Sequence, residues 1–132
     1  MRIRPLIPAD GALAAEIFFD AVQNGTADVY TQQQRNAWSG PAANPEGWMH
    51  RFQDIEGFAA ERDGIMVGFM TLDAQGHIDL AFVRPAEAGR GVGRMLYAQV
   101  ETSAQGNGIT RLTTEASKKA RPFFERMGWV VE

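Results

Sequence analysis

The feature that most restricts the fold of this chain is a glycine-rich loop between an expected strand and an expected helix. Three glycines alternate with other residues in the segment Gly89-Arg90-Gly91-Val92-Gly93. Alternating glycines leave one side of a loop without side chains, so backbone N–H groups can point at an anion, and a following helix adds its positive N-terminal end. The segment therefore predicts a phosphate-binding loop, and the alternative interpretation is an ordinary glycine-rich turn.

The spacing of these glycines excludes two other phosphate loops. A dinucleotide-binding loop has the pattern Gly-x-Gly-x-x-Gly, but its last position falls on Arg94 when counted from Gly89 and on Leu96 when counted from Gly91. A P-loop needs Gly-Lys followed by Ser or Thr, and the chain contains no such sequence. Positive charge nevertheless gathers around the loop, which favours a ligand with a di- or triphosphate. The arginines concerned are Arg84, Arg90 and Arg94.

The composition limits the class of protein and its partners. A chain of 132 residues suffices for one domain, and we expect residues 1–132 to form it. The net charge of −3 provides no overall positive field for nucleic acid or an anionic membrane, so we expect neither as a partner. The absence of cysteine removes disulfides, zinc–thiolate sites and thiol nucleophiles. Without a membrane-spanning apolar run or a signal-peptide core, the expected location is the cytoplasm.

The apolar pattern predicts a mixed α+β (α/β) fold in which helices flank a mixed sheet. The expected helices are Ala12–Val22, Thr31–Trp38, a segment opening at Asn44 with Trp48, Phe52 and Ile55 on one face, a segment from Val92 to the glycines at 106 and 108, and a segment from near Lys119 to Gly128. The expected strands are Arg2–Ile7, an antiparallel meander of Phe58–Glu61, Met66–Leu72 and His77–Val83, and Ile109–Glu115. The helical link before the last of these implies parallel pairing.

Three segments carry a resemblance to a known family. Ala88-Gly89-Arg90-Gly91-Val92-Gly93 fits a pyrophosphate loop of the pattern Gln or Arg, x, x, Gly, x, Gly or Ala at both final glycines, with Ala88 in place of Gln or Arg. The preceding Leu80-Ala81-Phe82-Val83-Arg84-Pro85 looks like the strand before that loop. Residues 117–129 resemble the signature Asn-x-x-Ala-x-x-Phe-Tyr-Glu-Lys-x-Gly-Phe, with Ser117 for Asn and Phe124 for Tyr. Over nearly its whole length the chain thus resembles the GNAT superfamily of acetyl-CoA-dependent N-acetyltransferases.

The resemblance implies that acetyl-CoA is the co-substrate and that no metal takes part. In this family the loop holds the CoA pyrophosphate chiefly through backbone N–H groups, and the end of the fourth strand pairs with the pantetheine arm. The residues that the resemblance assigns to acetyl-CoA are Phe82, Val83, Ala88, Gly89, Arg90, Gly91, Val92, Gly93, Arg94, Ser117 and Phe124. The implied reaction transfers an acetyl group to a primary amine of a small molecule or a peptide, which the sequence does not identify.

An amine must be neutral to attack a thioester, so the implied reaction needs a base. Strand alternation predicts one face with His77, Asp79, Ala81 and Val83 and an opposite face with Ile78, Leu80 and Phe82. Asp79 is the first candidate for the base, and Glu115 at the end of the parallel strand is the second. The alternative interpretations are a salt-bridged carboxylate for Asp79 and a solvated turn residue for His77.

The general acid is harder to assign because Phe124 has no hydroxyl group. The chain has two tyrosines, Tyr30 and Tyr97. Tyr97 lies within the helix after the glycine loop, where we expect it to pack. Tyr30 precedes the second helix, in the region that covers the acceptor site in the family, and is expected to be a substrate or acid residue. The thiolate can also leave without being protonated by the enzyme.

These observations predict a small, bacterial, cytoplasmic N-acetyltransferase. The competing hypothesis is a non-catalytic acyl-CoA-binding module, and a third is a phosphate binder unrelated to acyl transfer. Trp129-Val130-Val131-Glu132 begins a strand, so the final hairpin of the family is expected to be missing or truncated. An unpaired sheet edge is normally covered. We therefore expect a homodimer with this edge at or near its interface, the alternative being a truncated product.

Overall fold

The structure is a computed structural model that describes residues 1–130 of the chain. The strands are β1 (Arg2–Pro5), β2 (Glu56–Arg62), β3 (Ile65–Leu72), β4 (His77–Ile78), β5 (Ala81–Val83) and β6 (Thr113–Thr114). The α-helices are α1 (Gly11–Gly25), α2 (Gln32–Ser39), α3 (Val92–Gly106) and α4 (Arg121–Arg126). Short 3-10 helices cover Pro8–Asp10, Pro45–Trp48 and Pro85–Glu87.

The paired strands run in the directions that the sequence predicts, but fewer residues pair than expected. A four-stranded antiparallel sheet has the order β1-β2-β3-β5, and β4 pairs in parallel with β6. The two sheets are joined, because the N–H of Thr71 donates to the carbonyl of Leu80 at 2.9 Å and that of Asp73 to the carbonyl of His77 at 3.0 Å. The predicted mixed fold and the parallel crossover through α3 are therefore confirmed.

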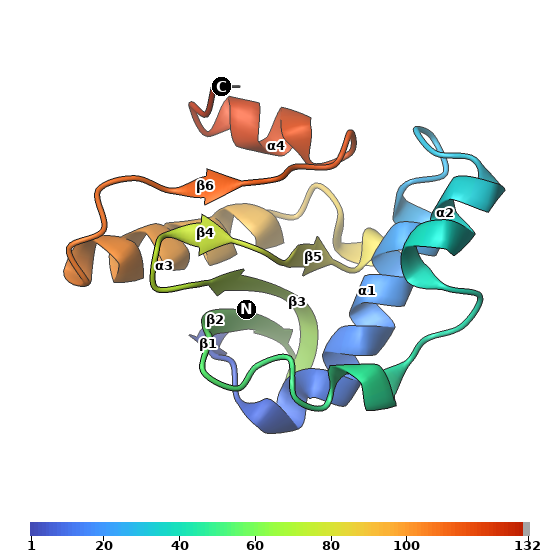
Figure 1. The fold of residues 1–132 in the computed structure, drawn as a ribbon, viewed down its shortest axis with the longest axis horizontal. Helices are drawn as coiled ribbons and strands as arrows, with labels where there is room; N and C mark the ends of the chain where they lie inside the picture. Colours follow the sequence, from blue (N-terminus) through green and yellow to red (C-terminus); the bar gives the residue numbers. More distant parts are fainter. Residues whose placement is uncertain (131–132) are drawn as a thin grey trace.

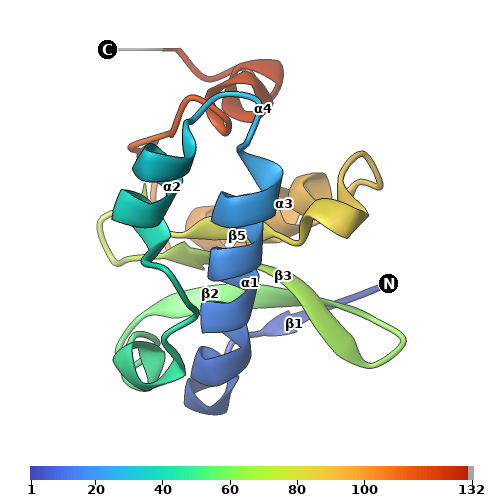
Figure 2. The same ribbon diagram turned by 90° about the vertical axis from the view of Figure 1, so that its right-hand side faces the viewer.

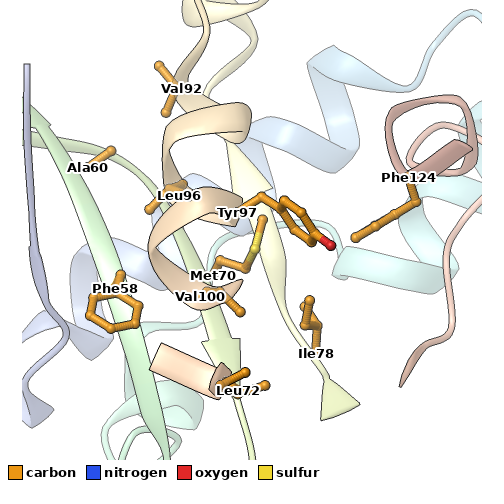
Figure 3. Close-up of a cluster of buried hydrophobic side chains, with 11 residues drawn as sticks. Phe58, Ala60, Met70, Leu72, Ile78, Val92, Leu96, Tyr97, Val100 and Phe124 are labelled. Carbon is orange, nitrogen blue, oxygen red and sulfur yellow. The ribbon is translucent and has the colours of Figure 1, made fainter. Parts of the chain in front are cut away.

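Helices cover both faces of this sheet (Figures 1 and 2). Against one face, α1 packs Ala14 and Ile17 onto Phe69 of β3 in a buried cluster. Against the other face, the apolar stripe of α3 packs onto β2 and β3, and α4 adds Phe124 to the same cluster (Figure 3). Each helix is therefore held by an apolar stripe that the sequence already displays.

The predicted strand His77–Val83 is interrupted at Asp79 and Leu80, which is a correction to the sequence analysis. Ile78 belongs to the cluster under α3, together with Ala81 and Val83, whereas Leu80 and Phe82 pack under α1. The predicted alternation placed Ile78 with Leu80 and Phe82, so the interruption changes the face on which β4 presents its side chains.

The helix predicted to open at Asn44 is also shorter than expected. Asn44 does cap it, accepting a hydrogen bond from the N–H of Gly47 at 3.2 Å, but only the 3-10 helix Pro45–Trp48 follows before the chain continues in turns. Gly47 weakens the helix, and Asp54 has a φ of 57°, which a right-handed helix does not allow. Trp48 and Phe52 are nevertheless buried. The apolar pattern therefore identified these core residues correctly but predicted the wrong backbone conformation for them.

The C-terminal part differs in strand length. Of the predicted strand Ile109–Glu115 only Thr113–Thr114 pairs, because β4 opposite it is two residues long. Pro122 falls in the first turn of α4, as predicted. Trp129 and Val130 are not in a strand, and Val131 and Glu132 lie outside the described residues. The homodimer remains a prediction.

Candidate active site

The glycine loop, residues 89–93, has an open surface where the sequence predicts an anion. Gly89 and Gly91 have φ values of +76° and +84°, which residues other than glycine rarely adopt. A Cβ atom added to either glycine would meet no other atom within 4 Å. The two residues are therefore glycines for their backbone conformation, and the space beside them is open to a ligand.

The start of α3 supplies the hydrogen-bond donors of this surface. Gly91 caps the helix without a side chain, and the first helical bond runs from the N–H of Met95 to the carbonyl of Gly91 at 3.1 Å. The N–H groups of residues 92–94 therefore have no acceptor within the helix. Buried Val92 fixes the direction of the helix end. Free N–H groups together with the helix dipole bind anions well.

The lack of a side chain at Gly93 also serves packing. A Cβ atom at this position would lie 3.2 Å from Cε2 of Phe123 in α4. Glycine at this position thus allows α4 to approach α3 closely. Substitution of Gly93 would disturb packing, whereas substitution of Gly91 would disturb the loop.

The arginines near the loop are less available than the sequence suggested. Arg84 pairs with Asp20 at 3.1 Å, and Arg90 pairs at 2.7 Å with Glu87, which is buried. Glu87 also accepts a hydrogen bond from Nε of Arg62 at 2.5 Å, and this bond lowers the pKa of Glu87. Arg94 is exposed and has no ion pair among residues 1–130, so its charge is the one available to an anion.

The interruption between β4 and β5 is stabilised from the neighbouring strand. The N–H of Leu80 donates to the hydroxyl of Thr71 at 3.0 Å, and Thr71 is fully buried in β3. Without this hydroxyl, the N–H of Leu80 would be buried and unpaired. A threonine inside the apolar run of β3 is the signal in the sequence that points to this role.

Asp79, the first candidate base, lies at this interruption. Its side chain is 56% exposed, and Oδ2 is 3.9 Å from Nη2 of Arg51. The guanidinium carbon of Arg51 lies 4.7 Å from the ring centroid of Trp48. The carboxylate is therefore accessible and has one weak ion pair. This ion pair is the feature expected if Asp79 is a salt-bridged carboxylate instead of a base.

Tyr30 and Ser117, predicted separately, are brought together by the fold. Both line a cavity of about 250 Å³, with Gln34 and Trp38 of α2, which we term the Tyr30 cavity. The hydroxyl of Tyr30 accepts a hydrogen bond from the N–H of Lys118 at 2.9 Å. Trp38 also contacts Phe82 of β5, with ring centroids 6.1 Å apart. The cavity thus lies where α2 meets β5 and the chain that follows β6.

The remaining candidates are placed elsewhere. Neither Asp79 nor Glu115 lines the Tyr30 cavity, and Glu115 is exposed just after β6. Nδ1 of His77 lies 2.9 Å from the hydroxyl oxygen of Thr113, and this hydrogen bond joins β4 to β6. Phe124 is only 4% exposed, so the contact with acetyl-CoA assigned to it remains a prediction.

Tyr97 is in the core, as predicted, with its hydroxyl end toward Phe124 (Figure 3). The hydroxyl accepts a hydrogen bond from Nε1 of Trp129 at 2.9 Å, and burial raises the pKa of Tyr97. A second cavity of about 1050 Å³ lies between α3, β6 and α4, and both Tyr97 and Phe124 line it. Both aromatic residues therefore belong to the wall between this cavity and the core.

Within residues 1–130, no three His, Asp or Glu side chains are grouped so that they could hold a metal ion together. Over the same residues, none of the helices has both the length and the apolar character that crossing a membrane requires.

Known proteins are similar to this chain over most of its length. Residues 26–132 match the family described as "Acetyltransferase (GNAT) domain". The uncharacterized N-acetyltransferase YafP of Escherichia coli K12 is 30% identical over 129 residues, which are 98% of this chain and 81% of YafP. The peptidyl-lysine N-acetyltransferase YjaB of Salmonella typhimurium LT2 is 37% identical over 65 residues, which are 49% of this chain and 43% of YjaB.

Solved structures share the fold. A structure from Rhodopseudomonas palustris, titled "GCN5-Related N-acetyltransferase: Aminotransferase, Class-II", has a TM-score of 0.91 and 34% identity and covers 99% of this chain and 82% of its own. The PaiA N-acetyltransferase of Thermoplasma acidophilum, in complex with coenzyme A, has a TM-score of 0.81 and 19% identity. The match covers 100% of this chain and 92% of the PaiA chain. The second likeness concerns the fold alone.

Proposed function

Because the chain belongs to the GNAT acetyltransferase family, we propose that it transfers the acetyl group of acetyl-CoA to a primary amine. The observation that carries this proposal is the junction of the glycine loop with α3. There the N–H groups of residues 92–94 have no helical acceptor, and the space above Gly89 and Gly91 is open. A pyrophosphate needs both features, and the exposed Arg94 adds a positive charge.

A second feature supports the placement of the pantetheine arm. β5 is the last strand of its sheet and pairs only with β3, so Ala81–Val83 has one edge without a strand partner among the described residues. The chain after β6 runs away from β5 (Figure 1). Phe82 lies in a hydrogen-bonded pair with Phe69, between the bonds that β3 makes at Leu80 and Arg84. The backbone groups of Ala81 and Val83 therefore face the free edge and can bond to the amide groups of pantetheine.

The proposed chemical step uses two groups of this chain. The nitrogen of a neutral amine forms a bond to the acetyl carbon, the C–S bond of the thioester breaks, and the sulfur leaves with the electron pair. Asp79, directly or through water, accepts the proton of the amine, with Glu115 as the second candidate. The hydroxyl of Tyr30 accepts a hydrogen bond from Lys118, so its own O–H is free to donate to the acceptor or to the thiolate.

The test combines purified protein, acetyl-CoA and a panel of amines that includes amino acids, polyamines, an aminoglycoside and a lysine peptide. Free thiol is followed with time, and the product is identified by the added mass of one acetyl group. The proposal expects amine-dependent thiol release with matching product. If CoA binds but no amine is acetylated, the chain is a binding module and the proposal is wrong.

A further inference from the structure

The Tyr30 cavity has walls without charge. Tyr30 and Trp38 meet edge to face, with ring centroids 5.7 Å apart, and Trp38 is 38% exposed. Gln34 and Ser117 contribute an amide and a hydroxyl, and no carboxylate lines the cavity. Such a site binds a flat or bulky apolar group and offers an incoming polycation no opposite charge.

One positive charge lies beside these walls. The ammonium nitrogen of Lys118 is 5.8 Å from the ring centroid of Tyr30, and its backbone N–H holds the Tyr30 hydroxyl. Within residues 1–130, no carboxylate pairs with Lys118. The neighbouring Lys119 is different, because its ammonium nitrogen is 2.8 Å from Oδ2 of Asp28. Of these two adjacent lysines, Lys118 therefore keeps a charge that a ligand can use.

We propose, on the basis of the proposed function, that the amine acceptor is a free amino acid with an aromatic side chain. The aromatic ring lies against Tyr30 and Trp38, and the carboxylate pairs with the ammonium group of Lys118. The α-amine is acetylated by the step described above, so no further reactant is needed. A free carboxylate next to the amine distinguishes this class from the N-terminus of a peptide, from a polyamine and from a lysine side chain.

The experiment compares L-phenylalanine with L-phenylalaninamide, which keeps the ring and the amine and removes the negative charge. The amine of the amide is less basic and more often neutral, so chemical reactivity alone favours the amide. The proposal expects kcat/KM for L-phenylalanine to exceed that for the amide by roughly tenfold or more. A lysine peptide with a blocked N-terminus, tested alongside, should react more slowly than L-phenylalanine.

Two variants assign the preference to one residue. Lys118→Gln should raise KM for L-phenylalanine roughly tenfold or more, with kcat little changed, and should leave L-phenylalaninamide unaffected. Lys119→Gln is the matched control and should leave both acceptors unaffected, because Lys119 is already paired with Asp28. Thermal midpoints of both variants exclude a loss of folding.

The proposal is overturned if the two phenylalanine derivatives react equally, if Lys118→Gln lowers both rates equally, or if the lysine peptide reacts faster. It is also overturned if neither derivative is acetylated. The proposed function fails separately, and only if no amine of the wider panel releases thiol from acetyl-CoA.

Discussion

Asp79 is the residue on which the proposed chemical step depends most. Asp79→Asn keeps the size of the side chain and removes its basicity, so turnover at neutral pH should fall by roughly 100-fold to 10,000-fold. The affinity for acetyl-CoA should stay the same, because the glycine loop lies on a different segment. Steady-state kinetics measure the first effect and calorimetry the second.

Glu115→Gln tests the second candidate for the base. Glu115 is a second exposed carboxylate near the end of a strand, and its variant should keep most of the turnover. Full activity of Asp79→Asn from about pH 6 to about pH 9 would reject Asp79 as the base. A loss in Glu115→Gln instead would transfer the role to Glu115.

Thr71 tests the account of the interruption between β4 and β5. Thr71→Val is nearly isosteric and leaves the N–H of Leu80 buried without its acceptor, so the free energy of unfolding should fall by about 1–3 kcal/mol. Urea unfolding measures this change. Thr102→Val removes an exposed hydroxyl bonded to the carbonyl of Ala98 and should change stability by less than about 0.5 kcal/mol. Equal stability of the two variants would contradict the role given to Thr71.

At the scale of elements, the segment between β5 and α3 is held to β2 by a buried carboxylate. The hydrogen bond from Arg62 lowers the pKa of Glu87 below its ordinary value of 4.5. The folded protein therefore binds fewer protons at this group than the unfolded chain does. Glu87 contributes stability that is fully present above about pH 4.5 and is lost as the pH falls through the folded pKa.

Glu87→Gln should therefore be less stable than the native protein at neutral pH, and the difference should shrink as the pH falls below about 4.5. The unfolding free energy in urea at a series of pH values measures this difference. Glu125→Gln, at an exposed glutamate paired with Arg121 on α4, should show a much smaller difference. A difference for Glu87→Gln that stays constant with pH would show that the ion pair does not carry the effect.

Elements held by their own apolar stripe could be predicted from the sequence. The helices α1 and α3 begin within one residue of the expected positions, because their apolar residues recur with a period of 3.6. The helix α2 buries no residue, and its start was predictable because Thr31 caps it. The division of the strand His77–Val83 could not be predicted, because it depends on a hydroxyl from β3. The pairing of Arg90 with Glu87 was missed because Arg62, from β2, fixes the carboxylate across the fold.

At the scale of the whole molecule, the candidate site is assembled from distant segments. The glycine loop is a single segment, so its spacing alone predicted it. The Tyr30 cavity joins the end of the α1–α2 connection to the chain after β6, and the bond between Tyr30 and Lys118 spans 88 residues. A sequence can suggest each member of such a site, but only the fold shows which members meet.

Figure 1 shows the N-terminal end of α3 beside β5, which α3 contacts. The proposed acetyl-CoA site therefore depends on the whole fold, although its donors belong to one loop. We expect the free N–H groups at this junction to bind the CoA pyrophosphate.

Calorimetric titration of CoA into the native protein, Gly91→Val and Gly108→Val tests this binding site. Gly91 and Gly108 both have positive φ values and open space beside them, but Gly108 lies beyond the other end of α3. Valine strains the backbone at either position, so both variants should lose stability to a similar degree. We expect Gly91→Val to lose CoA binding and Gly108→Val to retain it. Undiminished binding by folded Gly91→Val, or equal loss in both variants, would contradict the account.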